Sequence, residues 1–452
     1  MIKYHSTNKQ IINRTFQEAL FEGQAPDKGL YMPDTIPKFS NNELNELKNK
    51  SFADISVSVL SKFLLPEINK QQLNLIIRSS LNFDLPLEQL TRQIFILRLD
   101  QGPTASFKDI GARTMARLMQ YYLKKNNRSV TILTATSGDT GSAVASAFYG
   151  LENIKVILLF PEKEVTEVQR KQMTTLGKNI VSIAVQGKFD DCQAIVKQAF
   201  ADPDLETLNL TSANSINIAR LLPQTTYYFY AYLTLANAGT NKIIFSVPSG
   251  NFGNLTAGLI AKKMGLTKSF FISATNSNNS FVKFIKTQQY QPISPSLDCI
   301  SNAMNVGNPS NIARIFELYN GRITEKAKIL KQPNLEQLKK DLTAYSITDS
   351  ETLKAIQTCY EKYHTIIEPH GAVAFAAAEQ YLKQTKNLKL KDFKLIILET
   401  AHPEKFKDTV ENTLKIKLPL KSRFSNIYNK KEYIFRLKPE YDTIKKFLLE
   451  NI

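Results

Sequence analysis

One lysine stands where a helix is predicted to begin. Residues 106–113 read SFKDIGAR, and from Asp109 onward apolar side chains recur at the spacing of a buried helical face. Ser106 and Asp109 have the spacing of a capping box, which places Lys108 in the first turn. The helix dipole disfavours a cation there and should lower the pKa of the amine. A more neutral amine suits a nucleophile or a Schiff base; the alternative is an ordinary surface lysine.

Two glycine-rich loops have the composition of anion-binding sites. Residues 134–143 read TATSGDTGSA, and residues 248–258 read PSGNFGNLTAG. Each follows an apolar strand and precedes a helix, so backbone N–H groups would gather at a helix N-terminus. The second loop offers a nest of donors suited to phosphate, although it is neither a Walker loop nor a G-x-G-x-x-G fingerprint. The alternative for each loop is a tight structural turn.

A third strand end and one polar helix start complete the candidate chemistry. Residues 398–406 read LETAHPEKF and place Thr400 and His402 after an apolar strand, where a plain turn is the alternative. In residues 211–224 the side chains of Asn214, Ser215, Asn217 and Arg220 crowd the start of a helix. Arg220 could hold a second anion there with a bidentate fork, the alternative being a surface arginine. His370 lies in an alanine-rich helix and is interpreted as core scaffold.

A reactive amine, a phosphate nest and a strand-end hydroxyl together suggest pyridoxal phosphate. Lys108 would form the Schiff base, the GNFGN segment would hold the phosphate, and Thr400 would meet the pyridine nitrogen.

The elements that must position these residues alternate between strands and helices. Apolar strands are predicted at residues 129–135, 154–160, 179–187, 241–250 and 394–400, each separated by helical stretches. Such a pattern is typical of a parallel sheet with helices on both faces, whose ligands gather at the C-terminal strand ends. The first ninety residues instead favour helices with short connections.

Composition excludes several other classes of protein. The 452 residues are 43% hydrophobic and 22% charged, as in an ordinary globular chain. No apolar run is long enough for a membrane span, and the N-terminus has no signal-peptide core. Three distant cysteines and four scattered histidines favour neither disulfides nor a metal site. We therefore expect a cytoplasmic protein without membrane contact or bound metal.

The net charge of +17 allows three interpretations. It can be solvated surface lysine, it can attract a small anionic substrate, or it can bind nucleic acid. Basic residues are spread along the chain, and their densest run, residues 415–446, is interleaved with acidic ones. No aromatic-basic RNA signature is present, so we expect no nucleic-acid partner.

Six motifs in order resemble the threonine synthases, which are pyridoxal-phosphate enzymes of fold type II, the tryptophan-synthase β-like group. They read SFKDIGAR, TATSGDTGSAVASAFYG, NSINIARLLPQ, PSGNFGNLTAG, AMNVGNPSN and TAHPEKF. The resemblance covers about residues 1–415 and implies an α/β fold with two open, twisted, mostly parallel domains and a mainly helical N-terminal region. The domain limits it implies are 1–92 for the helical region, 93–125 plus 215–415 for the large cofactor domain, 126–214 for the small domain and 416–452 for a basic C-terminal extension.

The resemblance also implies roles for individual residues. Lys108 would carry the cofactor and shuttle protons, Thr400 would meet the pyridine nitrogen, and Asp139 would flank the cofactor's O3′ in place of the asparagine of cysteine-synthase-like relatives. The cofactor phosphate would be wrapped by Gly250, Asn251, Phe252, Gly253 and Asn254. The substrate carboxylate would be held by Thr136, Ser137, Gly138 and Thr140. The substrate phosphate would be held by Asn214, Ser215 and Arg220. Asp109 and Arg113 are expected to be structural.

The implied reaction converts O-phospho-L-homoserine and water to L-threonine and phosphate, by γ-elimination and β-addition of water, in a monomer or homodimer. One rival is a serine or threonine dehydratase of the same fold type, which needs no second anion site. A nucleotide-dependent oxidoreductase is disfavoured because its glycine fingerprint is missing.

Overall fold

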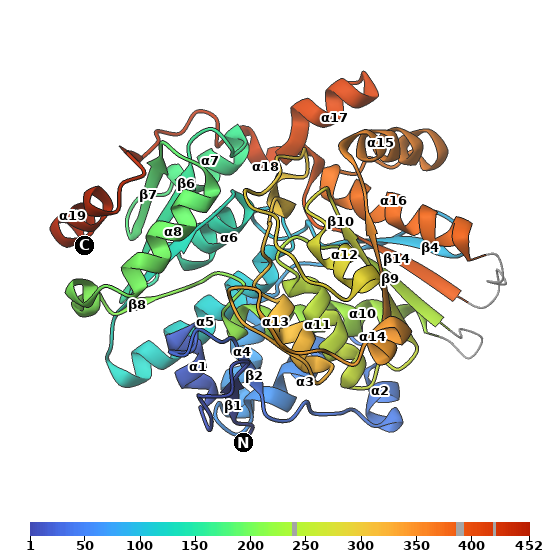
Figure 1. Cartoon of the computed structure of the whole chain (residues 1–452), viewed down its shortest axis with the longest axis horizontal. Coiled ribbons are helices and arrows are strands. Elements are labelled where there is room, and N and C mark those ends of the chain that lie inside the picture. The colour runs from blue at the N-terminus through green and yellow to red at the C-terminus, as the bar shows by residue number, and fades with distance from the viewer. Residues whose placement is uncertain (237–241, 386–392, 419–421) are drawn as a thin grey trace.

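In the computed structural model the chain folds around two separate parallel sheets, as Figure 1 shows. The structure describes residues 1–236, 242–385, 393–418 and 422–452. Among these residues no helix is long and apolar enough to cross a membrane.

The N-terminal region is mainly helical. A two-stranded antiparallel ribbon pairs β1 (Tyr4–Ser6) with β2 (Tyr31–Pro33). The helices are α1 (Phe16–Glu22), α2 (Asn41–Leu47), α3 (Phe52–Leu64) and α4 (Lys70–Ser80). Side-chain caps begin all four, from Thr15, Ser40, Ser51 and Asn69. Their apolar faces join the largest hydrophobic core cluster, which also contains one face of α5.

The larger sheet has six strands in the order β13-β10-β9-β14-β4-β3. The strands are β3 (Leu87–Gln89), β4 (Ile94–Arg98), β9 (Lys242–Pro248), β10 (Ser269–Thr275), β13 (Leu342–Ser346) and β14 (Phe393–Glu399). All neighbours are parallel except the short edge strand β3, which is antiparallel to β4. The C-terminal ends of β9 and β14 lie side by side and lead into the phosphate nest and the Thr400 loop.

The helices of this part of the chain pack on the sheet or on one another. They are α5 (Lys108–Asn126), α9 (Ile218–Leu221), α10 (Thr225–Leu235), α11 (Gly253–Lys263), α12 (Ser280–Thr287), α13 (Ile312–Leu318), α14 (Leu335–Asp341), α15 (Asp349–Tyr363), α16 (Pro369–Gln384) and α17 (Lys407–Leu414). Short 3-10 turns lie at η2 (Leu222–Gln224), η3 (Asn302–Met304) and η4 (Pro403–Phe406), and the ribbon β11 (Arg322–Ile323) with β12 (Ile329–Lys331) extends from α13.

The smaller sheet has five parallel strands in the order β15-β7-β6-β5-β8. Its strands are β5 (Val130–Ala135), β6 (Ile154–Pro161), β7 (Ile180–Val185), β8 (Leu210–Thr211) and β15 (Phe435–Leu437). The helices around it are α6 (Asp139–Phe148), α7 (Glu167–Thr174), α8 (Phe189–Phe200), α18 (Ser422–Ser425) and α19 (Tyr441–Asn451), with the turn η1 (Pro203–Leu208). β15 and α19 belong to the basic tail, so the tail adds an edge strand to β7 and packs Ile444 and Leu448 into the core beneath α8.

The predicted strands match observed ones within a few residues; residue 241 of the fourth lies outside the described residues. The strand predictions omit β3, β4, β10 and β13 of the larger sheet. The domain limits given above remain a prediction.

Candidate active site

The loop that precedes Lys108 is tied to the loop that follows β14. Phe107 N donates to Thr400 O at 2.9 Å, and His402 N donates to Ala105 O at 3.0 Å. These backbone bonds bring two segments almost 300 residues apart into one place. The predicted amine and the predicted strand-end hydroxyl therefore belong to the same site.

Lys108 is the first residue of α5, as predicted, but the predicted capping box is wrong. The residue before the helix is Phe107, which makes no side-chain cap. Asp109 instead accepts from Thr104 N and from Thr104 Oγ1, both at 2.8 Å. The chain enters the helix through a turn, so the Asp109 carboxylate faces the preceding loop and fixes it. Arg113 donates to Ser80 O at 2.6 Å and joins α5 to α4.

The pKa of Lys108 is lowered to about 8, and the main cause is removal of the amine from bulk water. The charge of Asp139 opposes this shift, whereas the charges of Lys405 and Arg220 add to it. The helix dipole predicts the same direction for the pKa of Lys108, but burial is the larger cause. An amine with this pKa is neutral in about a tenth of molecules at neutral pH, against less than one in a thousand for an ordinary lysine.

The GNFGN segment forms an open cradle of donors between β9 and α11. Phe252 takes a left-handed conformation with φ 61°, and α11 begins at the next residue. The described residues include no acceptor for the backbone N–H groups of residues 250–254. At Gly250 a Cβ would lie 2.8 Å from Ala303 O, so no larger residue fits. Unpaired donors at a helix start are the groups that a phosphate ester binds, and the cradle therefore fits the phosphate of pyridoxal phosphate.

Amide side chains fix the shape of this cradle. Asn254 Nδ2 donates to Pro248 O at 2.7 Å, closing the loop at its base. Asn251 Nδ2 donates to Ser215 Oγ at 2.6 Å, and Asn311 Nδ2 donates to Asn251 O at 2.9 Å. The predicted cofactor loop and the predicted substrate-phosphate loop are thus in direct contact through Ser215.

The substrate-phosphate candidates surround a buried guanidinium. Arg220 is 3% exposed, and its Nη1 donates to Ala213 O at 2.5 Å. Its Nε has no hydrogen-bond partner among the described residues. Burial lowers the pKa of Arg220 to about 10, with the charge of Asp109 opposing the shift. Asn214 is half-buried, and a buried cation with a free donor beside it makes a site for an anion.

A second buried arginine, not predicted from the sequence, supports this loop. Arg314 of α13 is fully buried and donates to Ser215 O at 3.1 Å and to Tyr31 O at 3.1 Å. Its Nη1 also donates to Asn311 Oδ1 at 2.7 Å. Arg314 therefore ties the N-terminal ribbon, α13 and the Ser215 loop together.

The loop after β5 holds the remaining predicted residues. Thr136 Oγ1 accepts from Gly138 N at 3.0 Å and from Gly141 N at 2.7 Å, so this hydroxyl shapes the loop. Gly138 has φ 121°, a conformation that favours glycine. Ser137 and Thr140 are half-buried. Their hydroxyls have no hydrogen-bond partner among the residues that the structure describes, and they are open to a ligand.

Asp139 begins α6 and lies in an ion pair. Its Oδ1 is 2.7 Å from Lys405 Nζ and also accepts from Gln169 Nε2 at 3.0 Å. Burial opposes ionisation, but the charges of Lys405 and Lys108 hold the pKa of Asp139 well below its usual range. The carboxylate is thus ionised next to the reactive amine.

Thr400 has an acidic neighbour. Its Oγ1 lies 3.5 Å from Glu368 Oε1, and Glu368 Oε2 lies 2.5 Å from His370 Nδ1. Glu368 also caps α16 by accepting from Gly371 N at 3.0 Å. His370, interpreted from the sequence as scaffold, does belong to this buried helix start, and its Nε2 accepts from Ala303 N at 3.1 Å.

The sequence reasoning missed Lys405, Glu368, Arg314 and Asn311. Lys405 and Asn311 lie inside motifs that were quoted, TAHPEKF and AMNVGNPSN, but nothing local marks either as buried in a site. Arg314 has the sequence context of a surface arginine on a short helix.

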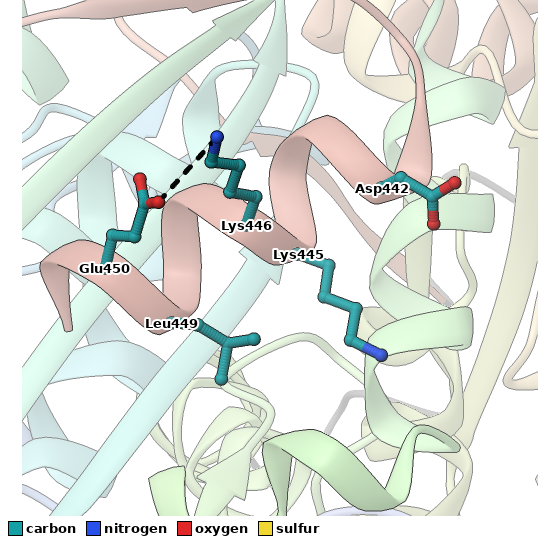
Figure 2. A pocket seen from close by; sticks show the side chains of 5 residues that line it. All are labelled: Asp442, Lys445, Lys446, Leu449 and Glu450. Atoms are coloured by element: carbon teal, nitrogen blue, oxygen red, sulfur yellow. Dashed lines mark ion pairs between the residues drawn. The ribbon is translucent and has the colours of Figure 1, made fainter.

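Two surface features lie apart from this constellation. A surface pocket of about 290 Å³ lies on α19. Figure 2 shows the five residues of that helix that line it, among them the exposed ion pair Lys446–Glu450. A cavity of about 440 Å³ beside β4 and η4 is lined in part by Arg98, His364 and His402. His402, predicted at the strand end, therefore faces this cavity.

The sequence matches family models along nearly its whole length. A model of pyridoxal-phosphate dependent enzymes matches residues 79–398. Models of the threonine synthase N terminus and C-terminal region match residues 3–81 and 371–448. The fold class and the cofactor predicted from the sequence are confirmed.

Individual relatives agree with the family models. The threonine synthase of Buchnera aphidicola subsp. Acyrthosiphon pisum is 40% identical over 445 residues, 98% of each chain. That of Escherichia coli K12 is 40% identical over 408 residues, 90% of this chain and 89% of the relative. The crystal structure of threonine synthase from Escherichia coli aligns over all of both chains with a TM-score of 0.89 and 36% identity. The threonine synthase from Brucella melitensis, solved with pyridoxal phosphate bound, aligns over 100% of this chain and 99% of that one with a TM-score of 0.91 and 31% identity. The chain belongs to the threonine synthase family of pyridoxal-phosphate dependent enzymes.

Proposed function

We propose that this enzyme converts O-phospho-L-homoserine and water to L-threonine and phosphate. The observation that carries the substrate assignment is the second anion site. Arg220 is buried with a free Nε, and the Ser215 loop beside it contacts the cofactor cradle through Asn251. A substrate with an amino-acid end and a phosphate end would place its amino-acid end at Lys108 and its phosphate at Arg220.

The cofactor would be held at three points by this chain. The backbone donors of residues 250–254 would bind its phosphate, Lys108 would hold its aldehyde carbon, and Thr400 would meet its pyridine nitrogen. When bound, pyridoxal phosphate supplies an electron sink that stabilises negative charge at the substrate carbons. Asp139 would lie near O3′.

The substrate would be held at its two charged ends. The hydroxyls of Ser137 and Thr140 would bind the carboxylate at the start of α6, with Thr136 and Gly138 shaping the loop. Asn214, Ser215 and Arg220 would bind the phosphate and stabilise it as it leaves Cγ.

Lys108 would move the protons. Its Nζ, neutral in an appreciable fraction of molecules, would take the Cα proton once the substrate amine has displaced it from the cofactor. Loss of a Cβ proton would then allow phosphate to leave Cγ. A proton would return to Cγ, water would add its hydroxyl at Cβ, and a proton would return to Cα before threonine leaves.

Four further proposals accompany this one. We infer a cytoplasmic enzyme that acts as a monomer or homodimer and has no nucleic-acid partner. We also propose the domain limits given above, with the extension 416–452 packed on the small domain, because β15 pairs with β7.

The test is product analysis with O-phospho-L-homoserine. The purified enzyme should release phosphate and L-threonine in equal amounts. Arg220→Ala should raise KM or lower kcat for this substrate at least tenfold, whereas Arg78→Ala, on the solvent-exposed face of α4, should change neither. A dehydratase would yield ammonia and a keto acid from serine or threonine instead, and an unchanged Arg220→Ala enzyme would refute the second anion site.

A further inference from the structure

The site contains a second buried lysine besides Lys108. The side chain of Lys405 is 0% exposed, and its Nζ lies 2.7 Å from Asp139 Oδ1, whose side chain is 4% exposed. Lys405 comes from η4, after the last strand of the larger sheet, and Asp139 begins α6 of the smaller sheet. The ion pair therefore joins the strand ends of the two sheets.

Both members of the pair have further partners that fix their positions. Lys405 Nζ donates to Thr104 O at 3.1 Å, and Gln172 Nε2 donates to the same oxygen at 3.1 Å. Gln169, from the same helix as Gln172, donates to Asp139. Thr104 in turn binds the Asp109 carboxylate next to Lys108. Lys405 is thus connected to Lys108 through one short loop as well as through Asp139.

The two charges act on Lys108 in opposite directions. Asp139 favours the charged form of Lys108 and Lys405 disfavours it. The other groups whose charges face Lys108 are Arg220 and Glu368, and His370 faces Asp139. An unpaired carboxylate at the position of Asp139 would hold a proton on Lys108 and oppose its reactivity.

We propose that Lys405 is a positioning residue of the active site, which fixes Asp139 beside Lys108 and offsets its negative charge. The positive charge of Lys405 then nearly cancels the negative charge of Asp139, at the position where cysteine-synthase-like relatives have asparagine. This inference rests on the proposed role of Lys108 as the cofactor lysine. The same contacts, which bind the Lys405 ammonium to Asp139 and Thr104, predict that Lys405 does not take the cofactor.

The test is a pH titration of the visible absorption of the enzyme loaded with pyridoxal phosphate, without substrate. The absorption reports protonation of the nitrogen that joins Lys108 to the cofactor. Lys405→Met should move the midpoint upward by about one pH unit or more, because Asp139 is left unbalanced. Asp139→Asn should move it downward, because Lys405 is left unbalanced. The double variant Asp139→Asn/Lys405→Met should return close to the unmodified enzyme.

Lys405→Arg is the matched control, since it keeps the charge and should leave the midpoint within a few tenths of a pH unit. If Lys405→Met does not fold, a downward shift in Asp139→Asn beside an unchanged midpoint in the Lys405→Arg control still decides the question. Shifts of the same sign in both single variants, or no shift in either, would overturn the proposal, because a purely structural bridge would not move the midpoint. Failure of the substrate assignment would leave this titration unchanged, so the two proposals fail separately.

Discussion

Gly111 lies against Arg220 of the proposed substrate-phosphate site, although it is not itself a proposed ligand of that phosphate. It lies in α5, one turn after Lys108, and a Cβ added there would lie 2.7 Å from Arg220 O and 3.1 Å from Arg220 Nε. Normal contact would require Arg220 O to move by roughly 0.7 Å. Overpacking of this kind costs about 1–3 kcal/mol, whereas alanine gains about 1 kcal/mol over glycine inside a helix. The net effect on unfolding free energy of Gly111→Ala should therefore be small, about 0–2 kcal/mol of destabilisation.

Gly111→Ala should also lower activity, because Arg220 would be displaced from its position. Displacement of a substrate-binding group by a fraction of an ångström can cost about tenfold in rate. We expect kcat/KM for O-phospho-L-homoserine to fall about tenfold, measured beside the unfolding free energy of the same variant.

A double-mutant cycle shows whether the loss acts through Arg220. In the Arg220→Ala background, Gly111→Ala should cost little further activity, because the displaced group is already absent. An equal loss of kcat/KM in both backgrounds, or full activity of the Gly111→Ala enzyme, would refute the argument.

Three more outcomes are expected. Gly250→Ala should weaken binding of pyridoxal phosphate at least tenfold, measured by equilibrium dialysis, because its Cβ would lie 2.8 Å from Ala303 O; unchanged affinity would contradict the cradle. Burial opposes the charge on His5, but hydrogen bonds to Glu317 and Asp34 raise its pKa, so protonated His5 should stabilise the fold fully at low pH and lose this effect as pH rises through the raised pKa. His5→Gln should remove this pH dependence from the unfolding free energy. Unfolding free energies of the two proteins that run parallel with pH would contradict the prediction. Because the pKa of Lys108 is lowered to about 8, its charge destabilises the folded cofactor-free protein most below pH 8. Lys108→Met should therefore raise the unfolding free energy more at about pH 6.5 than at about pH 9.5. Equal increases at the two pH values would rule this out.

Local features of the fold could be predicted from the sequence. The strand, glycine loop and helix around Gly250 are consecutive in the chain, so their order alone indicates a donor nest. Lys108 at the start of α5 follows from the apolar spacing of one helix.

Features that depend on distant contacts could not be predicted in this way. The partner of Asp109 is Thr104 in the preceding loop, which helical spacing does not specify, and the predicted capping box therefore failed. Lys405 meets Asp139 across 266 positions, and only the folded chain shows that both are buried. The dominant cause of the lowered pKa of Lys108 is likewise burial by segments that no local pattern identifies.

The central claim is that Lys108 is the lysine that holds pyridoxal phosphate. Borohydride reduction of the loaded enzyme fixes the cofactor on the amine that carries it, and peptide mass mapping locates that amine. We predict a single modified peptide that contains Lys108 and an unmodified peptide that contains Lys405, which lies in the same site. Modification of Lys405, or of any lysine other than Lys108, would contradict the account.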